Sequence, residues 1–126
     1  MQKFTVNDCP LKRAEKQEIE ANKFGFSWEN INQIIEQIQS ECLEVQKDWE
    51  SGDQIHLQEE LGDLLQAVIS LIVFCKLDPH EILLKASDKF QKRYDTVVKL
   101  AKQDGFETLH KQPFEVLMKY WNLAKN

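Results

Sequence analysis

The fold is decided by residues 30–75, which read NINQIIEQIQSECLEVQKDWESGDQIHLQEELGDLLQAVISLIVFC. Apolar side chains recur there every three or four positions on both sides of Gly52, which is the pattern of amphipathic helices. Asn30 is a suitable N-cap for the first helix, and Gly52 is a suitable end. The second helix begins near Asp53 and runs to about Cys75. We therefore predict two helices that fold back on each other as an antiparallel hairpin.

Three further helices are expected outside this hairpin. Residues 11–23 form a charged, weakly amphipathic stretch that ends at Gly25. Residues 78–81, Asp-Pro-His-Glu, combine an N-cap, a proline at the first helical position and a glutamate at the third. They start a long helix that ends at Gly105, and Pro113 opens a short last helix. No stretch alternates with a period of two residues, so the prediction is an all-α protein.

A chain of 126 residues is long enough to bury one hydrophobic core. We expect a single domain over residues 1–126, with residues 1–10 as a flexible lead-in. Its fold is expected to be a compact bundle of about four to five helices around the hairpin. Residues 67–74, in the second half of the hairpin, are apolar on every side. Other helices or a second subunit must therefore cover them.

Composition and charge exclude several classes of protein. The 21 acidic and 16 basic residues give a net charge of −5, which argues against a general nucleic-acid binder. Cys9, Cys42 and Cys75 are an odd number without paired spacing, so we expect free thiols in a reducing compartment, the last two of them in the core. The longest apolar run, residues 64–75, is too short to span a bilayer, and no secretory signal is visible. We expect a cytoplasmic protein.

Two carboxylate pairs carry the chemistry. Glu41 and Glu44 stand three residues apart, as do Glu60 and Asp63, so each pair shares one face of its helix. Glu44 precedes Gly52 by eight positions and Glu60 follows it by eight. An antiparallel hairpin therefore brings the two pairs to the same level, where they face each other.

Four carboxylates at one place repel each other unless cations neutralise them. Because all four ligands are hard oxygens, the expected ion is Mg²⁺, with Mn²⁺ as a substitute. A di-iron site is disfavoured, since the only Glu-x-x-His spacing, Glu107 to His110, falls in a loop. Gly62 lies between the second pair and costs about 1 kcal/mol in a helix, which suggests close backbone approach or room for a ligand. The alternative is an ordinary solvated acidic face.

The helix after residue 78 supplies the opposite charge. Lys85, Lys89 and Arg93 follow each other at intervals of four and form a cationic line beside Phe90. Such a line opposite metal carboxylates favours a metal-bridged polyphosphate. The chain has no glycine-rich phosphate loop, so cations and side chains must hold the phosphates. The alternative is a solvated basic face, which we expect for Lys92, Lys99 and Lys102.

The sequence predicts different roles for the three tryptophans. Trp49 falls on the apolar stripe of its helix, so we expect it in the core. Trp28 and Trp121 flank their helices. Either can stack on a nucleobase or simply pack against the protein.

In this order and spacing, the motifs resemble those of a known family. They are Phe24-Gly25-Phe26-Ser27-Trp28, Glu41-x-x-Glu44, Glu59-Glu60-Leu61-Gly62-Asp63-Leu64, Asp78-Pro79-His80-Glu81, Lys89-Phe90-Gln91-Lys92-Arg93-Tyr94 and Leu117-Met118-Lys119-Tyr120-Trp121. About residues 11–126 are similar to the MazG nucleotide pyrophosphohydrolases, in the all-α NTP pyrophosphatase superfamily. The similarity is greatest to the C-terminal catalytic domain of two-domain MazG proteins.

The resemblance implies a reaction and a partner. A nucleoside triphosphate, ribo or deoxyribo, would be hydrolysed at its α-phosphorus to a nucleoside monophosphate and pyrophosphate, as nucleotide-pool housecleaning. The four carboxylates would hold the metals and carry the catalysis. Lys89 and Arg93, with Lys85 nearby, would bind the phosphates, and Trp121 would lie against the base. Family members are usually homodimers or dimers of dimers.

Three positions depart from the family pattern. Ser40 replaces a glutamate that usually precedes Glu41, Gln37 replaces a basic residue, and Ser87 replaces an asparagine. These departures leave open a degenerate module that binds nucleotides, or regulates, without turnover. A pure oligomerisation bundle is a third reading, but it leaves the carboxylates unexplained.

Overall fold

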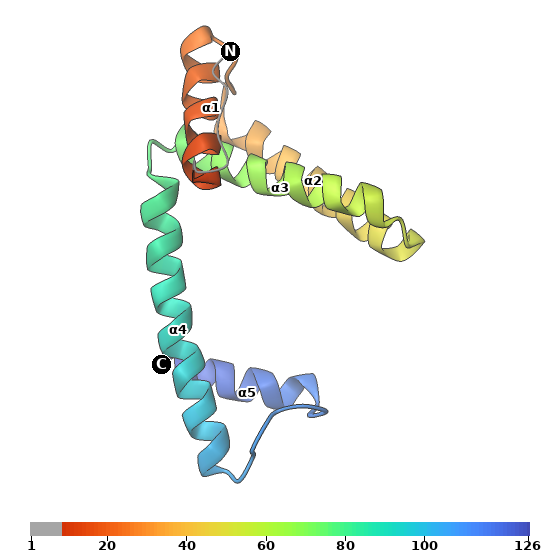
Figure 1. Ribbon diagram of the computed structural model, residues 1–126, viewed down its shortest axis with the longest axis vertical. Coiled ribbons are helices and arrows are strands. Elements are labelled where there is room, and N and C mark those ends of the chain that lie inside the picture. The colour runs from red at the N-terminus through yellow and green to blue at the C-terminus, as the bar shows by residue number, and fades with distance from the viewer. Residues whose placement is uncertain (1–8) are drawn as a thin grey trace. The chain divides into compact units, whose positions relative to one another are not determined.

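The computed structural model describes residues 9–126 (Figure 1). Within them lie five helices and no strand, which confirms the all-α prediction. The helices are α1 (Pro10–Phe24), α2 (Ile31–Ser51), α3 (Gln54–Phe74), α4 (Pro79–Gln103) and α5 (Phe114–Lys125). The expected flexible lead-in falls on residues 1–8, which lie outside the described residues, and on Cys9 and Pro10, the N-cap and the first residue of α1. Two compact units are formed, one ending at Ile82 and one beginning at Leu83.

The hairpin begins and ends where its capping residues predict. Asn30 Oδ1 accepts a hydrogen bond from the Gln33 backbone N–H at 3.0 Å and caps α2. Gly52 ends α2 with a positive φ of 74°, a conformation that glycine adopts without strain. Asp53 Oδ1 then accepts from the His56 backbone N–H at 3.1 Å and caps α3. A two-residue connection at Gly52 and Asp53 thus reverses the chain.

The core of the first unit lies between α2 and α3, which run antiparallel and side by side (Figure 1). Ile34 on α2 is fully buried, and Leu57 and Ile69 on α3 are nearly so. α1 packs against α3 and contributes the buried Ala14. Because the two long helices share one interface along their length, side chains on facing turns are held at fixed distances.

Three residues expected in the core are exposed instead. Trp49 has 69% of its surface exposed, and Cys42 and Cys75 are also exposed. The apolar stripe of α2 is wider than its contact with α3. Cys42 and Trp49 lie about a fifth of a turn around the helix from the buried Ile34, on the flank of the contact. The predicted burial of these residues is therefore wrong for the single chain.

The second unit is built from α4 and α5. Tyr120 is the most buried large side chain there, with 1% exposed, and its hydroxyl donates to Asp104 Oδ2 at 2.6 Å. The ring of Phe106 meets that of Tyr120 edge-on, with 6.3 Å between centroids. This cluster ties α5 to the residues that directly follow α4.

None of the helices in residues 9–126 combines the length and the apolar character that a membrane crossing requires.

Candidate functional site

The hairpin brings three of the four predicted carboxylates together. Glu41 on α2 and Glu60 and Asp63 on α3 each offer a carboxylate oxygen, and these oxygens all lie within 4.8 Å of one another. Glu60 and Asp63 stand one turn apart, so they reach the same point from successive turns. Glu41 faces them because antiparallel pairing around Gly52 sets its turn opposite theirs. Two helices thus build one acidic cluster.

Glu44 does not belong to this cluster. Its side chain is exposed, one turn nearer to the hairpin bend than Glu41. The symmetry of the sequence about Gly52 suggested that Glu44 and Glu60 would stand opposite each other. In the structure, Glu60 instead meets Glu41, which lies deeper along the hairpin. We refer below to Glu41, Glu60 and Asp63 as the acidic cluster.

The two carboxylate oxygens of Glu41 have different surroundings. Oε1 accepts a hydrogen bond from Gln37 Nε2 at 2.7 Å. Oε2 is buried, and among the described residues it has no hydrogen-bond partner. A buried carboxylate oxygen without a partner is costly, so this atom calls for a cation or an added proton. Sequence reasoning missed the role of Gln37, although its spacing of four from Glu41 could have indicated it.

The acidic cluster raises the pKa of Glu60 from 4.5 to about 7. The largest cause is the neighbouring Glu41 carboxyl, which can share a proton with Glu60 only when one of the two groups is protonated. Partial burial and repulsion from the charges of Glu41, Asp63 and Asp48 act in the same direction. At neutral pH, Glu60 is therefore only partly ionised beside Glu41 and Asp63.

A hard divalent cation fits this donor set. The oxygens are close enough together to coordinate one ion, and the Glu41 carboxylate has a buried, unpartnered oxygen, Oε2. Carboxylate oxygens without thiolate or imidazole partners favour Mg²⁺ or Mn²⁺. A cation would also relieve the repulsion that raises the pKa of Glu60.

Gly62 leaves space beside the acidic cluster. It lies in α3 between Glu60 and Asp63, and a Cβ added there would meet no atom within 4 Å. Close approach by the described part of the chain therefore does not explain the glycine. Room for a ligand or for another molecule is consistent with it.

A pocket of about 470 Å³ adjoins the acidic cluster, because Asp63 forms part of its wall. The segment after α1 supplies Phe26 and Trp28 to the wall. Trp28 is held in place by its indole Nε1, which donates to Ser70 Oγ on α3 at 3.0 Å. This cavity, the Trp28 pocket, offers aromatic surface beside the acidic cluster. Its polar wall also includes Glu18 and Gln66.

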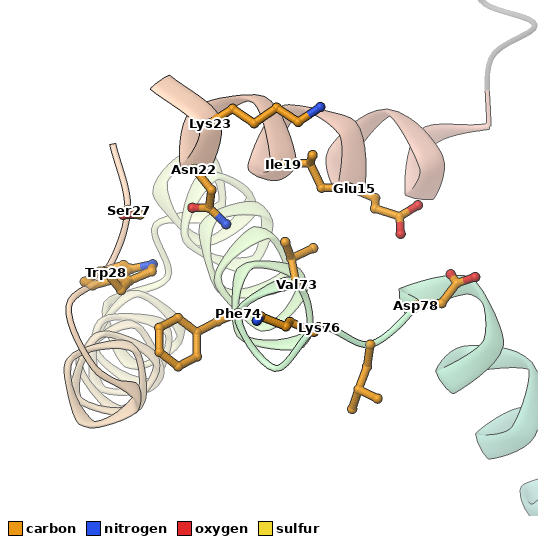
Figure 2. A pocket seen from close by; sticks show the side chains of 11 residues that line it. Glu15, Ile19, Asn22, Lys23, Ser27, Trp28, Val73, Phe74, Lys76 and Asp78 are labelled. Carbon is orange, nitrogen blue, oxygen red and sulfur yellow. The ribbon is translucent and has the colours of Figure 1, made fainter. Parts of the chain in front are cut away.

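A larger cavity of about 820 Å³ shares Ser27 and Trp28 with the Trp28 pocket (Figure 2). Trp28 and Phe74 line it together with Ile19 and Lys23 of α1 and with Asp78. None of the predicted metal carboxylates belongs to its wall. The smaller cavity is therefore the one that can hold a substrate against the acidic cluster.

In the second unit, the cationic line lies along α4. Lys85 and Lys89 are exposed, whereas Arg93 is half-buried, with its Cζ 5.6 Å from the centre of the Trp121 ring. Phe90 also contacts Trp121, with 5.8 Å between ring centroids. Arg93 is thus held by a cation–π contact, while the two lysines present mobile charges.

Comparison with known proteins identifies the family. Residues 29–98, more than half of the chain, match the model of the MazG nucleotide pyrophosphohydrolase domain. The chain belongs to the MazG family. It is 35% identical over 115 residues to the nucleoside triphosphate pyrophosphohydrolase/pyrophosphatase MazG of Thermotoga maritima, an alignment covering 91% of this chain and 44% of that protein. It is 28% identical over 131 positions to the nucleoside triphosphate pyrophosphohydrolase of Escherichia coli K12, covering 98% and 49%.

The chain therefore spans about half the length of these MazG relatives. The MazG match contains the whole acidic cluster and the cationic line. It leaves out α1, Trp28 and Trp121, which lie before and after it. The MazG domain thus includes the candidate metal ligands, while one wall of the Trp28 pocket comes from outside the match.

Proposed function

We propose that the chain hydrolyses nucleoside triphosphates, ribo or deoxyribo, to nucleoside monophosphates and pyrophosphate with Mg²⁺ as cofactor. In this reaction the oxygen of water bonds to the α-phosphorus while the bond from that phosphorus to the oxygen bridging the α- and β-phosphates breaks. The bridging oxygen leaves with pyrophosphate. The observation that carries the proposal is the acidic cluster, with the buried and unpartnered Oε2 of Glu41, beside a pocket of nucleoside size. The printed names of the relatives support the same reaction.

Glu41, Glu60 and Asp63 would hold the cation, and Glu44 would complete the set from the exposed side. When bound, a divalent cation supplies a Lewis acid that polarises the phosphate and lowers the pKa of the attacking water. Gln37 donates to Oε1 of Glu41 and so restrains this carboxylate, while Oε2 stays buried and unpartnered. The proton that water loses passes to one of the cluster carboxylates.

The phosphates would be bound by the cationic line. Lys89 and Arg93 would contact the β- and γ-phosphates and stabilise the departing pyrophosphate, with Lys85 at the edge. Arg93 suits this role because the Trp121 ring already orients its guanidinium. One face of the Trp121 ring is already used in that contact, so we assign the base to a different aromatic surface.

The Trp28 pocket would receive the base. A nucleotide whose base lies against Trp28 and Phe26 has its phosphates on the side of Asp63, where the acidic cluster begins. This order places the α-phosphate, the phosphate nearest the sugar, next to the cation. We also propose cytoplasmic nucleotide housecleaning as the setting, since triphosphates and reduced thiols coexist there.

A homodimer, alone or paired into a dimer of dimers, would cover the apolar flank of the hairpin. Leu61, Leu65 and Val68 follow at helical spacing on α3 and are exposed, Leu65 with 63% of its surface. Ile31 and Ile35 are exposed on α2. A Leu65→Glu exchange would place a charge in such an interface, and light scattering after gel filtration would then show monomers. An unchanged molar mass for the variant would contradict this arrangement.

Product analysis tests the reaction. The protein is incubated with a panel of canonical and modified triphosphates, with Mg²⁺, Mn²⁺ or EDTA, and the products are separated by chromatography. We expect monophosphate and pyrophosphate with either metal and neither with EDTA. In ¹⁸O-labelled water the label should appear in the monophosphate, because water attacks the α-phosphorus. Diphosphate and orthophosphate as products would overturn the assignment.

The alternative is a nucleotide-binding module without turnover, which the departures at Gln37, Ser40 and Ser87 motivate. It predicts that nucleotides raise the melting temperature while no product forms. The hydrogen bond from Gln37 to Glu41 counts against it, because the neutral side chain still orients the carboxylate. Turnover of any triphosphate in the panel would rule the alternative out.

A further inference from the structure

One polar pair in the Trp28 pocket has no part in the chemistry described above. Gln66 Nε2 on α3 donates to Glu18 Oε2 on α1 at 2.8 Å. Both side chains are half-buried, and both line the pocket. The two residues are 48 positions apart in the sequence, and they meet because α1 packs against α3.

The pair has hydrogen-bonding capacity beyond its own contact. An amide carries two N–H donors and a carbonyl acceptor, and a carboxylate carries two acceptor oxygens. The contact between Gln66 and Glu18 uses one donor and one acceptor site. The groups left over are mostly acceptors. They are the second carboxylate oxygen of Glu18, the amide oxygen of Gln66 and one remaining N–H of Gln66. One of these acceptors carries negative charge.

The pair also stands at the right place for a base. Gln66 follows Asp63 by one turn of α3, a rise of about 4.5 Å. A ligand that reaches from the acidic cluster into the pocket therefore passes Asp63 first and the pair next. Trp28 uses its indole N–H on Ser70, so it offers ring surface and leaves hydrogen bonding to other groups.

We propose that Glu18 and Gln66 select the nucleobase and favour bases that carry an exocyclic amino group. This inference rests on the proposed function. An amino group donates to the Glu18 carboxylate, as carboxylates accept from the N4 amino group of cytosine in other recognition sites. Uracil and thymine present a carbonyl oxygen at that position, and two acceptors facing each other repel. Cytosine is thus preferred to uracil, and guanine to hypoxanthine, which lacks the amino group.

The test compares CTP with UTP, which differ only in the atoms that the pair would read. We expect kcat/KM to be about tenfold higher for CTP, the discrimination typical of one well-formed contact to a base. Glu18→Gln replaces an acceptor by a donor at nearly constant volume and should reduce this preference about tenfold. Glu20→Gln is the matched control, because it makes the same charge change on the exposed side of α1 and should leave the preference unchanged.

A binding measurement separates this inference from the hydrolysis. CMP and UMP are titrated with Mg²⁺ present, and quenching of tryptophan fluorescence or calorimetry reports their affinities without turnover. Tighter binding of CMP, reversed or abolished in Glu18→Gln, supports the pair even if no triphosphate is hydrolysed. Equal affinities for CMP and UMP, or a wild-type preference for UTP over CTP or for ITP over GTP, would overturn it. An unchanged preference in Glu18→Gln would do the same.

Discussion

The acidic cluster and the cationic line, to which the proposed function assigns one substrate, differ in how firmly their side chains are held. Glu41, Glu60 and Asp63 come from two packed helices, and their oxygens already lie within 4.8 Å of one another. Lys85 and Lys89 extend into solvent from one helix, and only Arg93 of that line is held, by Trp121. Side chains that are fixed beforehand lose little entropy on binding, whereas exposed lysines must be ordered by the ligand.

This difference predicts how the two regions divide the kinetics. Losses in the acidic cluster should act mainly on kcat, because in the proposed reaction the cluster holds the metal at the reacting phosphorus. Losses in the cationic line should act mainly on KM, because in that proposal the line binds the distal phosphates. The following experiments probe that division, from the largest expected effect to the smallest.

Glu60→Ala should lower kcat roughly a thousandfold, since a catalytic metal contributes several kcal/mol to the transition state. Glu59→Ala is the matched control, because Glu59 is the exposed neighbour on the same helix and lies outside the cluster. Steady-state kinetics at saturating Mg²⁺, with circular dichroism to check the fold, measures both variants. Equal losses in the two would show that the acidic cluster has no special role.

Arg93→Ala should lower kcat/KM roughly a hundredfold, because it removes a charge-assisted contact to a distal phosphate that is made in the ground state and the transition state alike. Most of the loss should appear in KM. Lys92→Ala serves as control, since the preceding side chain is exposed and has no role in the proposal. If Arg93→Ala lowers kcat while KM stays constant, the division between the two regions is wrong.

Gln37→Met should weaken the apparent affinity for Mg²⁺ about tenfold, because partners that orient metal ligands typically contribute that much. Methionine keeps the volume but cannot donate to Glu41 Oε1. Gln39→Met makes the same exchange on the exposed side of α2. Activity is measured over a range of Mg²⁺ concentrations. A loss that excess Mg²⁺ does not rescue would indicate some other role for Gln37.

The smallest effect concerns pH. The acidic cluster raises the folded-state pKa of Glu60 from 4.5 to about 7, so the folded protein binds this proton more tightly than the unfolded chain. The resulting stabilisation is fully present below pH 4.5 and is lost as the pH rises through 7. In EDTA, the contribution of Glu60 to the melting temperature should therefore fall as the pH rises over that range. The Glu60→Gln variant should lack this pH-dependent contribution.

Added Mg²⁺ should raise the melting temperature more at pH 8 than at pH 5.5, because protons compete with the cation for the same oxygens. A wild-type protein whose melting curve in EDTA has the same pH dependence as Glu60→Gln would contradict this account.

Most of the fold follows from local signals in the sequence. The caps at Asn30 and Asp53 and the glycine at position 52 place the hairpin, because each satisfies backbone groups within a few residues of itself. The exposure of Trp49 and Cys42 was not predictable in this way. Periodicity shows which side chains share a stripe, but it does not show how wide the contact with α3 is.

The candidate site was likewise predictable only where local helical spacing determines it. Helical spacing was enough to select Glu41, Glu60 and Asp63, since residues three or four apart on packed helices converge. The same spacing also selected Glu44, because sequence spacing does not show which turn of α2 lies opposite Glu60. The contact between Glu18 and Gln66 joins distant segments that share no repeat, so only the packed structure reveals it.

Gly62 links the stability of α3 to the proposed activity of the acidic cluster. Exchanging glycine for alanine inside a helix typically gains about 1 kcal/mol, and the described chain has open space where the new methyl group would go. This chain nevertheless keeps a glycine there, between Glu60 and Asp63. Stability and turnover should therefore move in opposite directions in Gly62→Ala, which makes this residue a site where thermal robustness and catalytic performance compete.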